Sequence, residues 1–343
     1  MDPTSFRELG RTGLELTTLG LGSAPLGGFR GPIPEDEALD TVQAAYDAGV
    51  NYFDTSPYYG YGRSEHRFGQ VLRQVNRESF VLSTKIGRVL NPLPPGAQRP
   101  EDYRDGGLSF APTYDYSYDG TMRSIEDSYQ RLGLPSIDIV FIHDVDLYTH
   151  KDPDLVDRYF GAAMEGAYVA LDELRSAGVI RAIGGGLNDA ESCARFQRAG
   201  DFDCMMLAGR YTLLDQRALD DMLPLCAKQG VGVLIAGPFN SGILATGPVA
   251  GAMYDYSDAS KSILDKVRNI DSVCQRHDVA LQAAALQFPL GHTCVSAVVP
   301  GAVKPAEVEA NVAHMATPIP ADFWAELKHE GLVGEAAPIP EAD

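Results

Sequence analysis

The sequence is poor in basic residues. Its 343 residues contain 28 Lys and Arg against 47 Asp and Glu, which gives a formal net charge of −19. Such an excess of negative charge disfavours binding to the phosphate backbone of nucleic acids and to anionic membrane surfaces. We therefore expect neither a nucleic acid nor a membrane as a partner, and we interpret the charge as a contribution to solubility.

Cysteines are few and scattered. The five are Cys193, Cys204, Cys226, Cys274 and Cys294, and no two form a C-x-x-C pair. This spacing argues against a zinc site and against a disulfide framework, so we expect each cysteine to be a small buried hydrophobe. The first residues lack the basic and apolar regions of a secretory signal, and no apolar run is long enough to span a bilayer. We expect a cytoplasmic protein.

The glycine motif of a Rossmann fold is also missing. Gly20-Leu21-Gly22 is too short to match G-x-G-x-x-G at a strand-to-helix turn. Hydrophobic residues make up 45% of the chain and charged residues 22%, as in globular proteins. A chain of this length suits one α/β barrel, so we expect residues 1–343 to form a single domain.

Four apolar, strand-like runs each stop at a polar residue. The runs end at Asp54, Lys85, His143 and Asn188. A buried strand that ends in such groups loses stability unless the groups meet partners. Four such ends in succession predict four parallel strands whose carboxyl tips converge on one site, as on the catalytic face of a (β/α)₈ barrel.

The rest of the chain repeats this unit. Strands are predicted near 19–22, 51–54, 80–85, 137–142, 180–185, 203–207, 231–235 and 295–299. Helices are predicted near 34–46, 64–75, 119–133, 155–177, 189–199, 215–229, 260–277, 280–290 and 304–315. Eight strands that alternate with helices indicate a closed parallel barrel, an α/β fold of the TIM type.

Two connections are long. Residues 88–119 are rich in Pro, Gly and Tyr, and residues 237–259 form the second long loop. The aromatic run Phe110, Tyr114, Tyr116 and Tyr118 favours an ordered loop over the catalytic face, the alternative being a disordered surface insertion. The Pro- and acid-rich tail 336–343 is predicted to fray.

The segments 53–60, 82–85, 140–144 and 183–188 resemble the aldo-keto reductase superfamily, and the resemblance extends from Leu9-Gly10-Arg11-Thr12-Gly13 to Asn311. It implies a hairpin over 6–18 that plugs the bottom of the barrel. It also implies a catalytic tetrad of Asp54, Tyr59, Lys85 and His143. Each residue alone could be a turn, an exposed aromatic, a solvated strand end or a structural histidine. Tyr58 is the rival of Tyr59, which keeps the family spacing from Asp54.

The tetrad fits hydride transfer at a carbonyl carbon. Such a transfer needs a group that exchanges a proton with the oxygen, and tyrosine, with a reference pKa of about 10, needs help near neutrality. The Lys85 ammonium can stabilise the phenolate, and Asp54 can hold Lys85. The His143 imidazole can donate to the substrate oxygen and orient it. No metal is required.

The resemblance implies a nicotinamide dinucleotide extended across the barrel top. The expected contacts are Gly22, Ser23, Asn188, Gly237, Phe239, Ser241, Gly301, Lys304, Glu307 and Asn311. The expected substrate contacts are Tyr58, Tyr114, Tyr116 and Asp144. Three positions depart from the family pattern: Leu187 replaces a Ser, Ala208 a Gln, and Ala236 the aromatic that stacks on nicotinamide.

The adenosine end favours NAD, with NADP as the alternative. Relatives that prefer NADPH carry a Lys and an Arg against the 2′-phosphate, where this chain has Gly301 and Glu307. A carboxylate repels a phosphate and can accept hydrogen bonds from a free ribose diol. Lys304 opposes this interpretation, and Glu307 could instead cap the last helix.

Within the superfamily the chain resembles NAD-linked aldose 1-dehydrogenases acting on D-threo-aldoses or L-galactose, and pyridoxal 4-dehydrogenase. The resemblance implies oxidation of a cyclic hemiacetal to a lactone. One alternative is an NADPH-dependent reductase of aldehydes or ketones. The other is a regulatory subunit that binds cofactor with little turnover, like the β subunits of potassium channels. The sequence names neither the exact substrate nor the oligomeric state.

Overall fold

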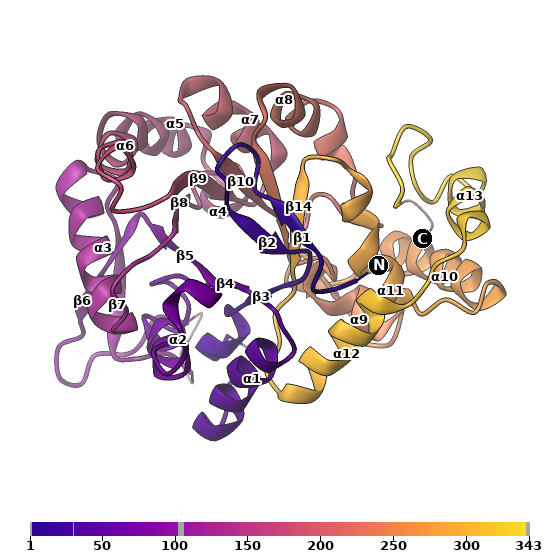
Figure 1. Ribbon diagram of the computed structural model, residues 1–343, viewed down its shortest axis with the longest axis horizontal. Helices are drawn as coiled ribbons and strands as arrows, with labels where there is room; N and C mark the ends of the chain where they lie inside the picture. The colour runs from indigo at the N-terminus through magenta and orange to yellow at the C-terminus, as the bar shows by residue number, and fades with distance from the viewer. Residues whose placement is uncertain (1, 30, 102–105, 341–343) are drawn as a thin grey trace.

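The computed structural model describes residues 2–29, 31–101 and 106–340. Its centre is one sheet of eight parallel strands surrounded by helices (Figure 1). In the order of their hydrogen bonding, the strands are β3 (Gly20–Gly22), β4 (Tyr52–Asp54), β5 (Val81–Ile86), β8 (Ile139–His143), β9 (Ala182–Leu187), β10 (Cys204–Ala208), β11 (Gly232–Ala236) and β14 (Val295–Val299). The parallel bridges Leu19 to Val298 and Gly22 to Gly301 join the first strand to the last. The predicted (β/α)₈ barrel is confirmed.

The core has two apolar layers, one inside the barrel and one between the barrel and the helices. Each strand contributes to both, because its successive side chains point to opposite faces. Ile139 and Phe141 point into the barrel, whereas Val140 and Ile142 pack against the helices. The antiparallel hairpin of β1 (Phe6–Glu8) and β2 (Glu15–Thr17) lies across the barrel in Figure 1. Its neighbouring leucines, Leu9, Leu14 and Leu16, belong to the interior cluster. The predicted plug is therefore present.

Helices follow the strands much as predicted. They are α1 (Glu35–Asp47), α2 (Arg63–Leu72), α3 (Tyr118–Leu132), α5 (Pro153–Ala162), α6 (Tyr168–Ser176), α7 (Ala190–Ala199), α8 (Met222–Gln229), α10 (Lys261–Arg276), α11 (Leu281–Gln287), α12 (Pro305–Ala316) and α13 (Ala321–His329). Short helical turns add α4 (Leu147–His150) and α9 (Ile243–Thr246). The helix predicted over 215–229 starts only at Met222, and α13 was not predicted.

The helix predicted over 155–177 contains a π-helical turn, Ala163–Ala167, between α5 and α6. Here the Ala167 N–H donates to the carbonyl of Tyr116 at 2.9 Å. A Cβ on Gly166 would lie 2.7 Å from the same carbonyl oxygen. The widened turn and the glycine thus let the segment that carries Tyr116 approach the helix closely.

The long loop 88–119 contains a hairpin that the sequence analysis did not foresee. Strand β6 (Arg88–Pro92) pairs antiparallel with β7 (Phe110–Tyr114), and Arg88 stands opposite Tyr114. The expected order over the catalytic face is thus present in the described part of this loop, and residues 102–105 lie outside it. The second long loop contains the two-residue strands β12 (Met253–Tyr254) and β13 (Ser257–Asp258).

The prediction of a fraying tail is wrong for residues 336–340. Ala337 is buried, and a Cβ on Gly291 would lie 2.6 Å from the backbone of Ile339. Pro338 and Ile339 of this segment contact the turn before β14. This packing holds the segment in place despite its prolines. Residues 341–343 lie outside the described residues.

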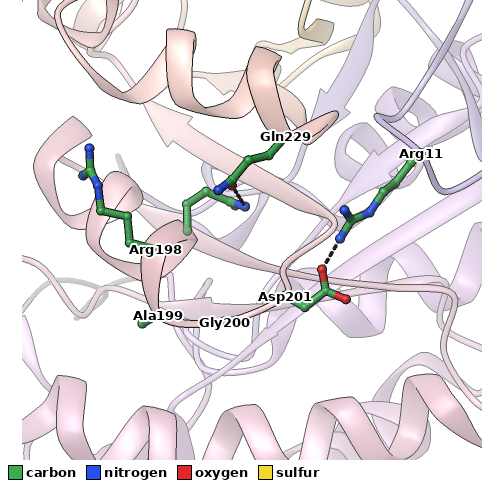
Figure 2. Close-up of a pocket in the computed structure, with 7 residues that line it drawn as sticks. Arg11, Arg198, Ala199, Gly200, Asp201 and Gln229 are labelled. Carbon is green, nitrogen blue, oxygen red and sulfur yellow. Dashed lines mark hydrogen bonds and ion pairs between the residues drawn. The ribbon is translucent and has the colours of Figure 1, made fainter.

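The amino-terminal end of the barrel, opposite the end that carries Asp54, Lys85 and His143, has a surface hollow of about 490 Å³ (Figure 2). An ion pair between Arg11 and Asp201 and a hydrogen bond between Gln197 and Gln229 cross it. Gln197 Oε1 has no hydrogen-bond partner among the described residues, but none of the predicted site residues lines the hollow. Within the described residues, no helix combines the length and apolarity needed to cross a bilayer.

Candidate active site

A buried ion pair forms the base of the site. Asp54 ends β4, and Lys85 lies near the end of the neighbouring strand β5. The Lys85 Nζ lies 2.8 and 2.7 Å from the two Asp54 carboxylate oxygens and donates to the carbonyl of Thr55 at 2.9 Å. The Ser83 hydroxyl donates to Asp54 Oδ1 at 2.7 Å. Burial raises the pKa of Asp54 and lowers that of Lys85, so each depends on the other to stay charged.

Tyr59 and His143 complete the predicted tetrad. The Lys85 Nζ lies 4.8 Å from the centre of the Tyr59 ring. The Tyr59 and His143 rings are 5.9 Å apart and nearly perpendicular, with an interplanar angle of 85°. The ring of the rival, Tyr58, lies instead under the guanidinium of Arg88, 4.1 Å from its centre. The contact with the ammonium therefore favours Tyr59 as the proton-exchanging group.

A small residue lies beside Phe141 and the lysine. A Cβ on Gly186 of β9 would lie 3.3 Å from Phe141 Cβ and 3.6 Å from Lys85 Cε. The sequence analysis treated the run Gly184-Gly185-Gly186 only as part of a strand. The run is the signal that could have indicated a side chain crossing this part of the barrel.

His143 lies at the end of β8 in a fully enclosed setting. Its Nδ1 lies 3.3 Å from the Ser56 hydroxyl and 3.3 Å from Nη1 of Arg88. Its Nε2 lies 3.5 Å from Asp144 Oδ1, too far for a strong hydrogen bond. Burial, together with the charges of Arg88 and Lys85 and against that of Asp144, lowers the pKa of His143 to about 3. The imidazole is therefore neutral at neutral pH.

Asp144 joins the predicted substrate side of the site to the predicted cofactor side. Its Oδ2 accepts from Arg88 Nη2 at 2.7 Å, and its Oδ1 accepts from Asn188 Nδ2 at 2.8 Å. Against the effect of burial, these contacts and His143 lower the pKa of Asp144 to about 2. Its backbone has φ of +57°, a region where a non-glycine residue costs about 1–3 kcal/mol and marks functional sites.

The other predicted substrate contacts differ in exposure. Tyr58 and Tyr114 are half-buried, and both rings lie against Arg88. Tyr116 is only 2% exposed, and its hydroxyl donates to the carbonyl of His143 at 2.7 Å. Because this hydroxyl is already hydrogen-bonded to the backbone of His143, the structure favours a supporting role for Tyr116 over contact with a substrate.

The predicted cofactor contacts lie at the carboxyl ends of strands, the end where barrels bind ligands, or at the start of and within the helix α12 that follows β14. Gly22 and Ser23 lie at the end of β3, and Asn188 directly follows β9. Ser23 is fully buried, and its hydroxyl has no hydrogen-bond partner among the described residues. The Asn188 amide nitrogen also donates to Asp146 Oδ2 at 3.0 Å.

The loop after β11 fits an extended phosphate-containing cofactor. Gly237, Asn240, Ser241 and Gly242 have φ of +59°, +46°, +60° and +104°. Left-handed residues in succession fold the backbone into a concave turn of the type that receives anions. Asn240 is 3% exposed, and its Oδ1 lacks a partner among the described residues. Phe239 packs partly buried against the core at the base of this turn.

The predicted contacts for the adenosine end lie between β14 and α12 and on α12 itself. A Cβ on Gly301 would lie 2.5 Å from Cγ of Pro25, so a lysine does not fit there without displacing the proline. Glu307 accepts the backbone N–H of Val303 at 2.9 Å, so the helix-capping role weighed above is present. Lys304 is the exposed N-cap of α12. Asn311 is 9% exposed on the same helix.

No group of three or more His, Cys, Asp or Glu within residues 2–29, 31–101 and 106–340 is arranged to hold a metal ion. Four of the five cysteines are buried, and Cys294 is partly buried. Their burial agrees with the expected role as small hydrophobes.

Comparisons with known proteins agree with this geometry. Residues 18–330 match the sequence model of the aldo/keto reductase family. The chain is 42% identical to pyridoxal 4-dehydrogenase of Microbacterium luteolum, covering 95% of this chain and 97% of the relative. It is 39% identical to D-threo-aldose 1-dehydrogenase of Pseudomonas sp, covering 94% and 96%. L-Galactose dehydrogenase of Arabidopsis thaliana is 31% identical, covering 91% and 88%.

A solved structure shows the same fold. The holo form of an aldo-keto reductase from Bacillus halodurans superposes with a TM-score of 0.73 at 25% identity, covering 97% of both chains.

Proposed function

Because the chain belongs to the aldo/keto reductase family and is an oxidoreductase, we propose that it oxidises a cyclic hemiacetal to a lactone with NAD⁺. The observation that carries this proposal is the buried Lys85–Asp54 pair, whose ammonium lies 4.8 Å from the Tyr59 ring. A cation in this position stabilises a phenolate and lets Tyr59 accept a proton near neutral pH.

The residues divide the work at the substrate carbon. Tyr59 takes the proton of the anomeric hydroxyl, and a bound nicotinamide would supply the acceptor for the hydride on the anomeric carbon. His143, neutral and enclosed, donates to the substrate oxygen and orients it. Lys85 and Asp54 keep the proton acceptor charged. A hemiacetal already offers one C–H and one O–H on one carbon, so the reaction needs no activated water.

The residues around the adenosine end support NAD over NADP. The Pro25 contact leaves no space for a lysine at position 301, and Glu307 places a carboxylate in the first turn of α12. We propose that Asn188, Gly237, Phe239 and Ser241 hold the nicotinamide and pyrophosphate.

Two substrate groups remain candidates. The aldose 1-dehydrogenase relatives favour a sugar, and the 42% identity to pyridoxal 4-dehydrogenase favours pyridoxal as the second. The half-buried rings of Tyr58 and Tyr114 offer an aromatic surface that suits a flat heteroaromatic substrate as well as a pyranose. The buried and partly buried free cysteines support the cytoplasm as the location.

The test is a set of initial rates with NAD⁺ and with NADP⁺ against aldoses and pyridoxal, followed by NMR of fresh reaction mixtures. We expect NAD⁺ to be preferred and lactone to appear before free acid. Acid formed at the rate of NADH, without a lactone lag, would refute the hemiacetal mechanism. Faster carbonyl reduction with NADPH would favour the reductase, and tight cofactor binding without any turnover would favour a regulatory subunit.

A further inference from the structure

Arg88 is a buried charge that the proposed chemistry does not itself require. It is the first residue of β6, just after the turn at Gly87 that ends β5. Gly87 has φ of +110°, and a Cβ there would lie 2.2 Å from the Tyr116 ring, so only glycine fits this turn. The turn sends the Arg88 side chain, 4% exposed, back over His143.

Both terminal nitrogens of the guanidinium have partners, whereas Nε has none among the described residues. Its Nη2 donates to Asp144 at 2.7 Å and to the Tyr114 hydroxyl at 3.0 Å. The Tyr58 and Tyr114 rings lie 4.1 and 4.7 Å from its central carbon. With these contacts, the position of Nη1, 3.3 Å from His143 Nδ1, is fixed.

This contact decides which imidazole nitrogen carries the proton. A guanidinium has donors only and stays charged at all accessible pH values. The Nδ1 that faces it must therefore accept, and the neutral ring must carry its hydrogen on Nε2. The second neighbour of Nδ1, the Ser56 hydroxyl at 3.3 Å, can donate as well.

We propose that Arg88 is a positioning residue that holds His143 as the neutral Nε2–H tautomer, with Nε2–H available to the substrate oxygen. The catalytic part of this statement rests on the proposed function. The tautomer does not, since it follows from the Arg88 contact alone.

The groups that face the His143 imidazole determine how the loss of Arg88 would change its pKa. They are Arg88 from β6, Asp144 after β8, Lys85 from β5, and the phenols of Tyr58 and Tyr59. Without Arg88, Asp144 loses its cation and faces the imidazole alone. Asp144 already raises the pKa of His143 in the wild type and Arg88 lowers it, so removing the Arg88 charge should raise this pKa.

The experiment is ¹⁵N NMR of the histidine side chains between pH 5 and 8, in the full chain without substrate. The His143 signals are assigned by their loss in His143→Gln. We expect wild type to show Nε2–H and no titration. Arg88→Met should show the Nδ1–H form or begin to titrate within this pH range. Arg88→Lys, which restores a charged donor, should return the wild-type pattern.

Arg175→Met is the matched control. Arg175 pairs with Asp203 at 2.8 Å at the amino end of β10, so its loss removes a comparable ion pair away from His143. It should leave the His143 signals unchanged.

Wild-type signals in a folded Arg88→Met would overturn the proposal. If that variant does not fold, Nδ1–H in wild type would overturn it equally. Loss of the tautomer with retained lactone chemistry would refute only the catalytic part.

Discussion

Replacing Lys85 by methionine tests the electrostatic basis of the site. Methionine keeps much of the length of the side chain beside Gly186 and removes the ammonium. The change deletes the contacts of 2.8 and 2.7 Å to Asp54 and the charge 4.8 Å from the Tyr59 ring. The proton acceptor would then lose the cation that stabilises its phenolate.

The distance sets the size of the effect. With the phenolate charge placed at the ring centre, 4.8 Å from Nζ, and an effective dielectric constant of about 20, the two unit charges interact by about 3.5 kcal/mol, equivalent to about 2.5 pKa units. The Asp54 carboxylate acts in the opposite direction and reduces this effect. Because the cation favours the phenolate, its loss moves phenolate formation, and with it the residual activity, to higher pH. The rate should fall by at least about 10²-fold.

Stability must be separated from chemistry in this test. Breaking a buried ion pair from one side costs about 3–5 kcal/mol, since Asp54 would remain as an unpaired charge. The double variant Asp54→Asn/Lys85→Met removes both charges and should recover part of the lost thermal stability without recovering the rate. The assay is kcat/KM from pH 6 to 11 beside thermal denaturation and cofactor binding. A residual activity with the wild-type pH profile would refute the tuning argument.

Three further changes probe other parts of the site. Tyr59→Phe should lower turnover by at least about 10²-fold with cofactor binding nearly intact; a wild-type kcat, combined with an inactive Tyr58→Phe, would move the assignment to Tyr58. Glu307→Arg should improve NADP⁺ use relative to NAD⁺ because a cation replaces a repulsive carboxylate; a wild type that already prefers NADP⁺ contradicts this. Burial lowers the pKa of His143 from 6.5 to about 3, so the unfolded chain binds an extra proton between these values and stability falls as pH decreases, by up to about 5 kcal/mol. Urea denaturation of His143→Gln should show a smaller fall, and parallel pH curves would argue against it.

The barrel, and the meeting of Asp54, Lys85 and His143 on one face, could be predicted because their signals are local. Each strand is a short apolar run, and the polar residues Asp54, Lys85 and His143 stand within the last residues of theirs. Parallel strands bring such ends together whatever the loops do. The order of the segments along the chain was therefore enough to place three of the four residues on one face.

The parts that were missed depend on contacts that no local pattern encodes. The strands β6 and β7 are separated by 17 residues, 93–109. Their pairing brings Arg88 opposite Tyr114. A Pro- and Gly-rich stretch gives no sign of such pairing. The close approach of Ile339 to Gly291 is likewise a long-range contact, and the left-handed backbone of Asn240 and Ser241 is imposed by the fold.

Arg88 also changes how the charges of the site should be counted. With Arg88 paired to Asp144, and Lys85 to Asp54, the two cations nearest His143 are each neutralised by a buried carboxylate. Both cations still oppose an imidazolium, so His143 remains a neutral donor and is poorly suited to take the substrate proton. In the proposed mechanism Tyr59, whose ring lies 4.8 Å from the Lys85 ammonium, is then the group that accepts it. The proposed division of roles between His143 and Tyr59 thus rests on two ion pairs, of which the sequence indicated only one.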